Sequence, residues 1–179
     1  YNNRGILKNR LGEYQSALED FNRAALRVKL DKAKVYYNRG IAKLNLGDYR
    51  GAEEDFGEAI RMSPKYSSAY SNRGLVRSEK LSDLAGAIKD FDMAIRLDPA
   101  DPYPRYNRGN ALLRSGQLEE ALSDYDQVLQ IEPRFAAAYF NKGVVLLKRK
   151  DREGACSNWN QASDLGAESA AELIKWYCR

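Results

Sequence analysis

The sequence contains no histidine, which removes the commonest general base and metal ligand of proteins. It has only two cysteines, Cys156 and Cys178, which are too few for a disulfide framework and lack metal-ligand spacing. A glycine-rich phosphate-binding loop is also missing. Adjacent carboxylates such as Glu53 and Glu54 point about 100° apart on a helix, so they form a solvated face and no acid and base pair. We therefore expect no enzyme, no metal and no cofactor.

The chain also lacks a long apolar run and a strong charge of one sign. No segment approaches the roughly 20 apolar residues that span a bilayer, so we expect no membrane insertion. The 29 basic and 25 acidic residues leave a formal charge of +4, and the basic residues are not clustered, so nucleic acid is not the expected partner. The sequence opens at Tyr1 inside a repeat, which indicates a fragment or a mature form. A targeting signal could have preceded it, so the compartment stays open.

What the chain does have is internal repetition. A glycine preceded by asparagine and then arginine or lysine recurs at intervals of 35, 34, 35 and 34 residues. The five glycines are Gly5, Gly40, Gly74, Gly109 and Gly143. An alanine follows each glycine about one helix later, with an aromatic residue four positions further on: Ala17 with Phe21, Ala52 with Phe56, Ala87 with Phe91, Ala121 with Tyr125, and Ala155 with Trp159. Recurrence at this period indicates stacked structural repeats.

This pattern resembles the tetratricopeptide repeat (TPR) family, whose units combine an aromatic residue, a glycine, a turn, an alanine, an aromatic residue and a closing proline. The resemblance covers essentially the whole chain. It implies an all-α, right-handed superhelical solenoid of five TPR helix-turn-helix repeats plus a C-terminal capping helix. Two positions depart from the family: Arg or Lys replaces Leu before the glycine, and the aromatic usual three residues after the glycine is Lys8, Lys43, Arg77, Leu112 or Leu146.

We expect one domain over residues 1–179, with repeats at about 1–32, 33–66, 67–101, 102–135 and 136–167 and a capping helix at about 168–178. First helices are predicted near 1–11, 33–46, 67–80, 103–115 and 135–149, and second helices near 14–28, 49–62, 84–97, 118–131 and 152–164. Asp101 reads as a helix cap before a first-turn proline, Pro102. In the last helix a stripe of Ala170, Leu173, Ile174 and Tyr177 is expected to cover the core of repeat five.

An asparagine stands two residues before every one of these glycines: Asn3, Asn38, Asn72, Asn107 and Asn141. In the TPR family the first helices line the concave side, and the resemblance implies that this position faces the groove. The row is similar to the asparagine ladder in the TPR region of O-linked N-acetylglucosamine transferases. An amide both donates and accepts, so such a row can bind an extended peptide main chain without reading its sequence. The alternative is a hydrogen bond between helices that only orients the repeats.

Apolar side chains are expected on the same helix face as the asparagines. Tyr37, Tyr106 and Phe140 directly precede an asparagine, and Ile41 and Leu75 directly follow a glycine. They predict a groove for a segment with apolar or aromatic side chains, with burial in the core as the alternative for the aromatic rings. We therefore predict a scaffold for a protein or peptide partner. A structural or self-associating repeat array, an RNA-binding helical repeat and a regulatory module of a larger protein are the alternatives.

Two further expectations concern structure. A guanidinium at a half-buried helix interface needs a partner, and the candidate is the aspartate before each second-helix aromatic residue. The expected pairs are Arg4 with Asp20, Arg39 with Asp55, Arg73 with Asp90, and Arg108 with Asp124. In repeat five both partners change together, to Lys142 and Asn158. Cys156 is expected to be a buried core thiol. The alternative is a bridge to Cys178, which needs Cα atoms within about 7 Å.

Overall fold

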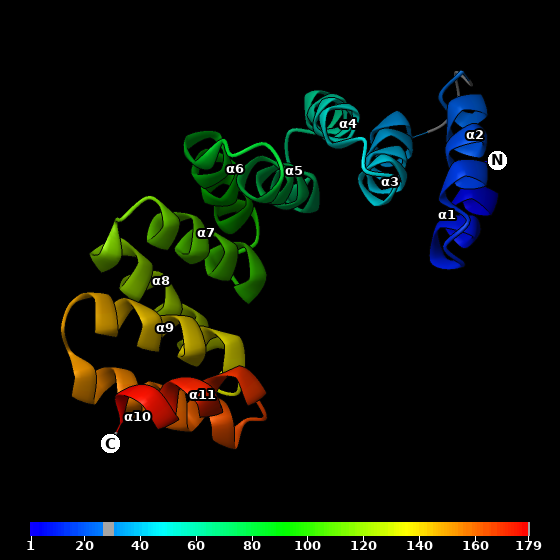
Figure 1. Cartoon of the computed structure of the whole chain (residues 1–179). Coiled ribbons are helices and arrows are strands. Elements are labelled where there is room, and N and C mark those ends of the chain that lie inside the picture. The colour runs from blue at the N-terminus through cyan, green and yellow to red at the C-terminus, as the bar shows by residue number, and fades with distance from the viewer. Residues whose placement is uncertain (27–30, 179) are drawn as a thin grey trace. The chain divides into compact units, whose positions relative to one another are not determined.

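The structure is a computed structural model that describes residues 1–26 and 31–178. Within these residues the chain is entirely helical (Figure 1). The first helices of the repeats are α1 (Asn2–Arg10), α3 (Lys32–Asn45), α5 (Ser67–Glu79), α7 (Pro102–Arg114) and α9 (Ala136–Lys148). The second helices are α2 (Tyr14–Ala25), α4 (Tyr49–Met62), α6 (Leu84–Leu97), α8 (Leu118–Ile131) and α10 (Arg152–Asp164), and α11 (Glu168–Tyr177) follows them.

The expected architecture of five helix pairs and a final helix is confirmed, with most helix ends within one or two residues of their predicted places. One predicted helix, near 14–28, reaches beyond the described residues at positions 27 and 28, and its described part, α2, ends at Ala25. Asp101 caps α7 as expected, because its side chain accepts a hydrogen bond from the backbone N–H of Tyr103 at 3.0 Å.

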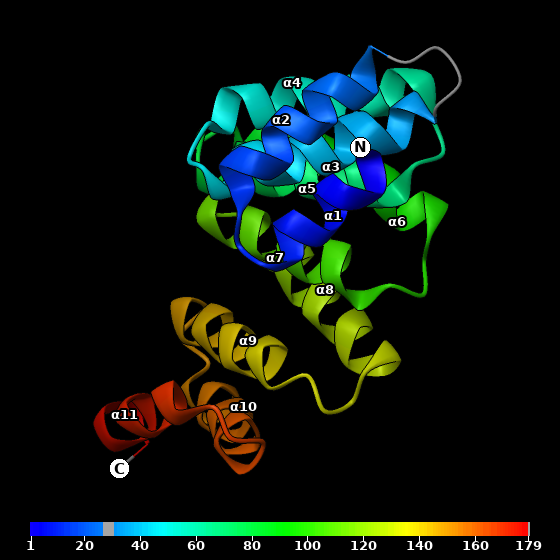
Figure 2. The same ribbon diagram turned by 90° about the vertical axis from the view of Figure 1, so that its right-hand side faces the viewer.

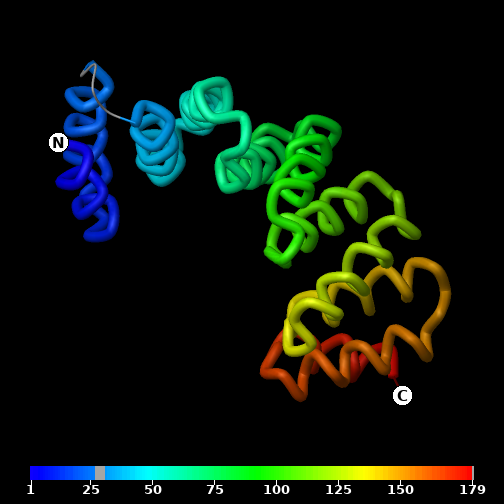
Figure 3. The backbone as a smooth tube through the Cα atoms, turned by 180° about the vertical axis from the view of Figure 1, so that it is seen from behind, coloured from blue at the N-terminus to red at the C-terminus, as the bar shows by residue number. Residues whose placement is uncertain are grey.

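The helix contacts divide the chain into two compact units, Tyr1–Leu97 and Asp98–Arg179, here called unit 1 and unit 2. Inside each unit every helix packs against its neighbours in the sequence, and Figure 3 shows α1 and α2 side by side in unit 1. In addition α1 contacts α3, and α7 contacts α9. First helices of successive repeats therefore lie next to each other within a unit. The expectation of a single domain stays a prediction.

The repeating glycines mark the place where an aromatic ring meets the first helix of the same repeat. A Cβ atom added to Gly40 would lie 2.8 Å from Cε1 of Phe56, and the other four glycines meet the ring of their own repeat in the same way. No side chain larger than hydrogen fits there without displacing the ring. Phe56 is fully buried and clusters with Val76 of the next repeat. The ring thus joins its own first helix to the following repeat.

A left-handed residue ends the first helix of most repeats. Gly12, Gly47 and Gly116 have φ angles of +79°, +82° and +81° between the two helices of a repeat. Glycine adopts this conformation without the steric cost that a Cβ atom brings. Lys150 takes the corresponding place in repeat five, with a φ of +66°, and Ser82 has a φ of +58° in the longer turn of repeat three.

The last helix closes unit 2. α11 packs against α10, and both lie side by side in Figures 1 and 2. Ala170 is fully buried, and Leu173 and Ile174 pack against the cluster that contains Trp159. The ring of Tyr177 lies 5.8 Å from that of Trp159. The prediction that this stripe covers the core of repeat five is confirmed.

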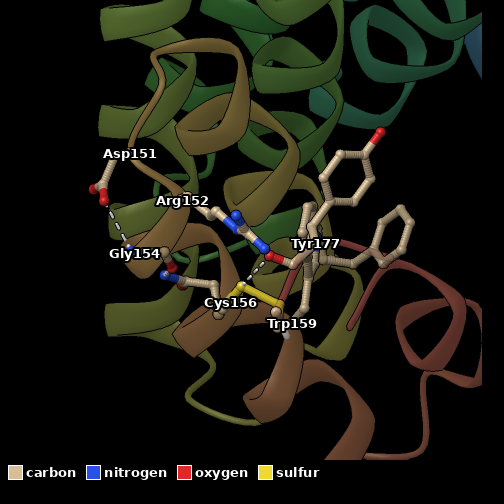
Figure 4. Close-up of a disulfide and its surroundings, with 9 residues drawn as sticks. Asp151, Arg152, Gly154, Cys156, Trp159 and Tyr177 are labelled. Carbon is tan, nitrogen blue, oxygen red and sulfur yellow. Dashed lines mark hydrogen bonds between the residues drawn. A yellow bond between two sulfur atoms is a disulfide. The ribbon is translucent and has the colours of Figure 1, made fainter. Parts of the chain in front are cut away.

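The expectation of a free core thiol is wrong. Cys156 and Cys178 form a disulfide with a Cα–Cα distance of 5.6 Å (Figure 4). Cys156 is half-buried at the edge of the core, and α11 runs back along α10 and so brings Cys178 beside it. Arg152, one turn before Cys156, donates a hydrogen bond from Nε to the carbonyl of Tyr177. The end of the capping helix is therefore held both covalently and by a hydrogen bond.

Candidate functional site

The five ladder asparagines all lie on first helices, three in unit 1 and two in unit 2. Asn3 on α1 is exposed, while Asn38, Asn72, Asn107 and Asn141 are half-buried. All five side chains are therefore at least partly exposed to solvent. The sequence left two roles open for this row, ligand binding and the orientation of repeats. The hydrogen bonds of the individual amides differ within each unit.

In unit 1 the amide of Asn72 is bonded to the preceding repeat. Its Nδ2 atom donates to the hydroxyl of Tyr37 at 2.9 Å and to the backbone carbonyl of Ser68 at 3.0 Å. The ring of Tyr37 lies 5.7 Å from that of Phe56 and 4.8 Å from that of Tyr66. Burial raises the pKa of Tyr37, and burial raises that of Tyr66 to about 12. Both hydroxyls therefore stay protonated at neutral pH.

The other two ladder asparagines of unit 1, Asn3 and Asn38, make fewer side-chain hydrogen bonds than Asn72. The backbone carbonyl of Asn38 accepts a hydrogen bond from Nδ2 of Asn9 at 3.2 Å, which links α1 to α3. Among the described residues, the side-chain amides of Asn3 and Asn38 have no hydrogen-bond partner. These two amides are therefore available for a ligand.

In unit 2 the amide of Asn141 enters a small network. Its Nδ2 atom donates to the hydroxyl of Tyr106 at 3.1 Å and to Oδ1 of Asn110 at 2.8 Å. The hydroxyl of Tyr125 donates to the same Oδ1 atom at 2.8 Å. Tyr125 is fully buried, and burial raises the pKa of its hydroxyl. Asn110 thus supplies the partner that a buried tyrosine needs at the place where the first three repeats have phenylalanine.

The side-chain amide of Asn107, the other ladder residue of unit 2, is in the same hydrogen-bonding state as that of Asn38. Within the described part of the chain its side-chain amide makes no hydrogen bond. The preceding residue, Tyr106, packs its ring 5.0 Å from that of Phe135 and 6.1 Å from that of Tyr125. Tyr37 and Tyr106 therefore have the same role in their units. The hydroxyl of each accepts a hydrogen bond from the asparagine that lies 35 residues further along the chain.

The apolar residues predicted beside the ladder have different environments. Phe140 is half-buried and packs against the cluster of Trp159, whose Nε1 donates to the Phe140 carbonyl at 3.1 Å. Ile41 is also half-buried and packs against the cluster of Phe56. Leu75 lies in a depression of about 280 Å³ in unit 1, lined by Leu44, Leu75, Val76, Glu79 and Lys80. Leu75 therefore lines a hollow of the surface.

The four predicted arginine–aspartate pairs are confirmed, and all are bidentate. In each, Nε and Nη2 of the arginine donate to the two carboxylate oxygens, at distances between 2.5 and 2.9 Å. The aspartate side chains are nearly fully buried, with exposed fractions of 2–4%. The hydrogen bond from Arg4 holds the pKa of Asp20 well below its usual range. In repeat five, Lys142 instead pairs with Asp126 at 2.6 Å.

A second cation at three of these aspartates was missed in the sequence. Lys8, Lys43 and Arg77, which stand where the family has an aromatic residue, reach Asp20, Asp55 and Asp90 at 2.9, 3.1 and 2.9 Å. Arg77 also bonds to Glu53 at 2.7 Å. The recurrence of a cation three residues after the glycine was the available signal. These side chains are engaged by the buried aspartates and stabilise the helix pairs.

The described residues hold no group of three or more His, Cys, Asp or Glu side chains placed to bind a metal ion. No described helix combines the length and the apolar composition that a membrane span requires.

Comparison with known families decides how the chain is classified. Models of the tetratricopeptide repeat match residues 37–102, 91–123 and 109–150. The chain belongs to the tetratricopeptide repeat family. TPR domains are protein-interaction scaffolds that are typically not catalytic, and the fold of helix pairs described above is that of a TPR solenoid. No curated protein matches the chain at a significant level.

Solved TPR structures match over most of the chain. YrrB, described as a TPR protein with an unusual peptide-binding site, is 26% identical over 98% of this chain and 90% of its own, with a TM-score of 0.83. MamA from Desulfovibrio magneticus RS-1 is 24% identical over 92% of both chains, with a TM-score of 0.85. Another MamA structure is 19% identical over 96% of this chain and 99% of its own, with a TM-score of 0.85. The likeness to MamA shows the fold.

Proposed function

We propose that this TPR protein binds an extended peptide segment of a partner protein along its first helices, with the ladder asparagines of each unit bonding to the peptide main chain. The observation that carries the proposal is the state of Asn38 and Asn107. Both are half-buried on a first helix, and in the described residues neither amide has a protein partner. These amides therefore keep their donors and their acceptor for a peptide main chain, which would replace the water that solvates them.

The surroundings of these amides support a peptide ligand. Tyr37 and Tyr106 directly precede the two asparagines, and Leu75 lines the depression on unit 1. Aromatic and apolar surface next to amides suits an extended chain, which needs main-chain hydrogen bonds together with places for its side chains. The similarity to YrrB, a protein described by its peptide-binding site, points in the same direction.

Paired alanine variants in each unit test the proposal. A library of random 12-residue peptides displayed on phage is selected on the whole chain, and the affinity of the best binder is measured by fluorescence polarisation. We expect N38A/N72A or N107A/N141A to weaken binding by at least about tenfold, since each lost hydrogen bond is worth about 1 kcal/mol. Asn160→Ala, the same change at an exposed site on α10, is the control. Unchanged affinity in both paired variants would rule out the ladder as a binding site.

Self-association is a second candidate, favoured by exposed aromatic side chains. Trp176 on α11 is 76% exposed and its neighbour Tyr177 is 41% exposed, so the capping helix presents aromatic surface that a second copy of the chain could cover. Light scattering of the wild-type chain and of Trp176→Ser measures this directly. A dimer that is lost in the variant would favour self-association, and a monomer in both would remove this candidate.

A further inference from the structure

The ladder asparagines are not equivalent, because their hydrogen-bonding capacity differs. A primary amide has two N–H donors and an oxygen with two acceptor sites. In Asn72 both donors are used, one by the Tyr37 hydroxyl and one by the Ser68 carbonyl. A carbonyl can only accept, so the atom of Asn72 that faces Ser68 has to be the nitrogen. What Asn72 has left for a ligand is its Oδ1 atom.

Asn141 in unit 2 also makes two side-chain hydrogen bonds, but its partners, a hydroxyl and an amide, can each donate or accept, so no backbone carbonyl fixes its orientation as Ser68 fixes that of Asn72. Its two N–H donors go to the Tyr106 hydroxyl and to Oδ1 of Asn110, and that oxygen also accepts from Tyr125. Oδ1 of Asn141 has no partner among the described residues. With this orientation both units contain one asparagine that only accepts, Asn72 or Asn141, and one that donates and accepts, Asn38 or Asn107. The Ser68 carbonyl fixes the orientation of Asn72, and the orientation of Asn141 is part of the proposal.

We propose that Tyr37 and Tyr106 determine specificity by turning Asn72 and Asn141 into acceptor-only positions, each of which binds a main-chain N–H of the ligand. The inference rests on the proposed function and deepens it. A peptide carbonyl at these two positions would meet an oxygen and be rejected. A proline there is excluded because it has no N–H to donate. The ligand is therefore an extended segment with a free N–H opposite the second asparagine of the unit it occupies.

The state of the amides can be tested without a ligand. In NMR spectra of the whole chain, we expect the side-chain N–H hydrogens of Asn72 and Asn141 to exchange with water about fivefold or more slowly than those of Asn38 and Asn107, because they are hydrogen-bonded. Tyr37→Phe keeps the ring and removes the acceptor, so it should speed exchange at Asn72 and leave Asn141 unchanged. Tyr106→Phe is the matched variant for Asn141. Equal exchange rates at all four asparagines would overturn the proposal.

The binding test uses the display-selected 12-residue peptide with each main-chain N–H replaced in turn by an ester oxygen. At one position we expect the ester to weaken binding about fivefold in the wild-type chain and to have no further effect in Asn72→Ala or in Asn141→Ala, depending on the unit bound. If those alanine variants weaken binding but no ester couples to them, the acceptor-only proposal fails and the ladder remains a binding site. If N38A/N72A and N107A/N141A leave binding unchanged, the proposed function itself fails.

Discussion

At the scale of single residues, the buried aspartates are the most demanding side chains of the protein. Asp55 is 2% exposed and is held by Arg39 at 2.6 Å and by Lys43 at 3.1 Å. A buried carboxylate is tolerated when cations and hydrogen bonds replace its hydration, and the two cations depend on it in return. The charged residues that replace the usual apolar or aromatic residues of the family therefore act as a set.

We expect Asp55→Ala to lower the free energy of unfolding by about 3 kcal/mol, because it leaves two half-buried cations without a counter-charge. Chemical denaturation followed by circular dichroism measures the change. Glu58→Ala on the same helix is the control. It removes an exposed ion pair with Arg61 at 2.8 Å and should cost less than about 1 kcal/mol. Equal losses in the two variants would mean that the buried pair is no more important than the surface pair.

At the scale of helices, the repeat is built on a contact between a helix and a ring. Each repeating glycine allows the aromatic ring of its own repeat to touch the first-helix backbone. Gly57 on α4 makes no such contact, and a Cβ atom added there would lie at an ordinary 3.6 Å from Nη1 of Arg73. The same residue type is therefore required in one place and replaceable in another.

Gly40→Ala and Gly57→Ala are expected to change stability in opposite directions. The first forces a methyl group against Phe56 and should cost about 2 kcal/mol by overpacking. The second removes backbone freedom of the unfolded chain inside a helix and should add about 0.5 kcal/mol. Urea denaturation of the two variants measures both values. Destabilisation of similar size in both would show that helix propensity, and not contact with the ring, decides the effect.

The turn of repeat five offers a stabilising substitution. Lys150 adopts a φ of +66° where Gly12, Gly47 and Gly116 stand in other repeats. Because a left-handed conformation costs a residue with a Cβ atom about 1 kcal/mol, we expect Lys150→Gly to raise the free energy of unfolding by about that amount. Gly116→Lys should lower it by a similar amount. Thermal unfolding of both variants gives the comparison, and a less stable Lys150→Gly would contradict this account.

At the scale of the whole molecule, the chain consists of two units with different means of stabilisation. Unit 1 has the aspartates held by two cations, whereas unit 2 has the disulfide between α10 and the end of α11. The bridge spans 22 residues of sequence and holds the helix that covers the core of repeat five. Loss of the bridge should therefore lower the stability of unit 2.

We expect the double variant C156S/C178S to lose about 3 kcal/mol of stability in unit 2, from the chain entropy that the bridge removes. Hydrogen exchange should show lower protection in α10 and α11, while α3 and α4 in unit 1 keep theirs and serve as the internal control. Thiol titration of the unfolded wild-type chain should find no free thiol. Two free thiols, or equal loss of protection in both units, would contradict the role assigned to the bridge.

The sequence by itself determined the repeat period, the order and extent of the helices, the glycine at each ring contact and the pairing of Arg39 with Asp55 and its counterparts. These features recur at nearly constant spacing, and each depends on neighbours inside one helix pair, whose geometry is set by helix periodicity. A pattern repeated along the chain fixes such contacts without knowledge of the rest of the fold. The position of the ladder asparagines on the first helices follows for the same reason.

Only the tertiary structure decided the disulfide and the hydrogen-bonding state of each asparagine. Cys178 meets Cys156 because α11 folds back along α10, and no sequence period relates the two residues. Whether the second N–H of Asn72 is free or bonded depends on the position of the Tyr37 hydroxyl in the preceding repeat. Such contacts join side chains from different elements, and a change of an ångström in how helices stack makes or breaks them, because hydrogen bonds and disulfides tolerate little variation in distance.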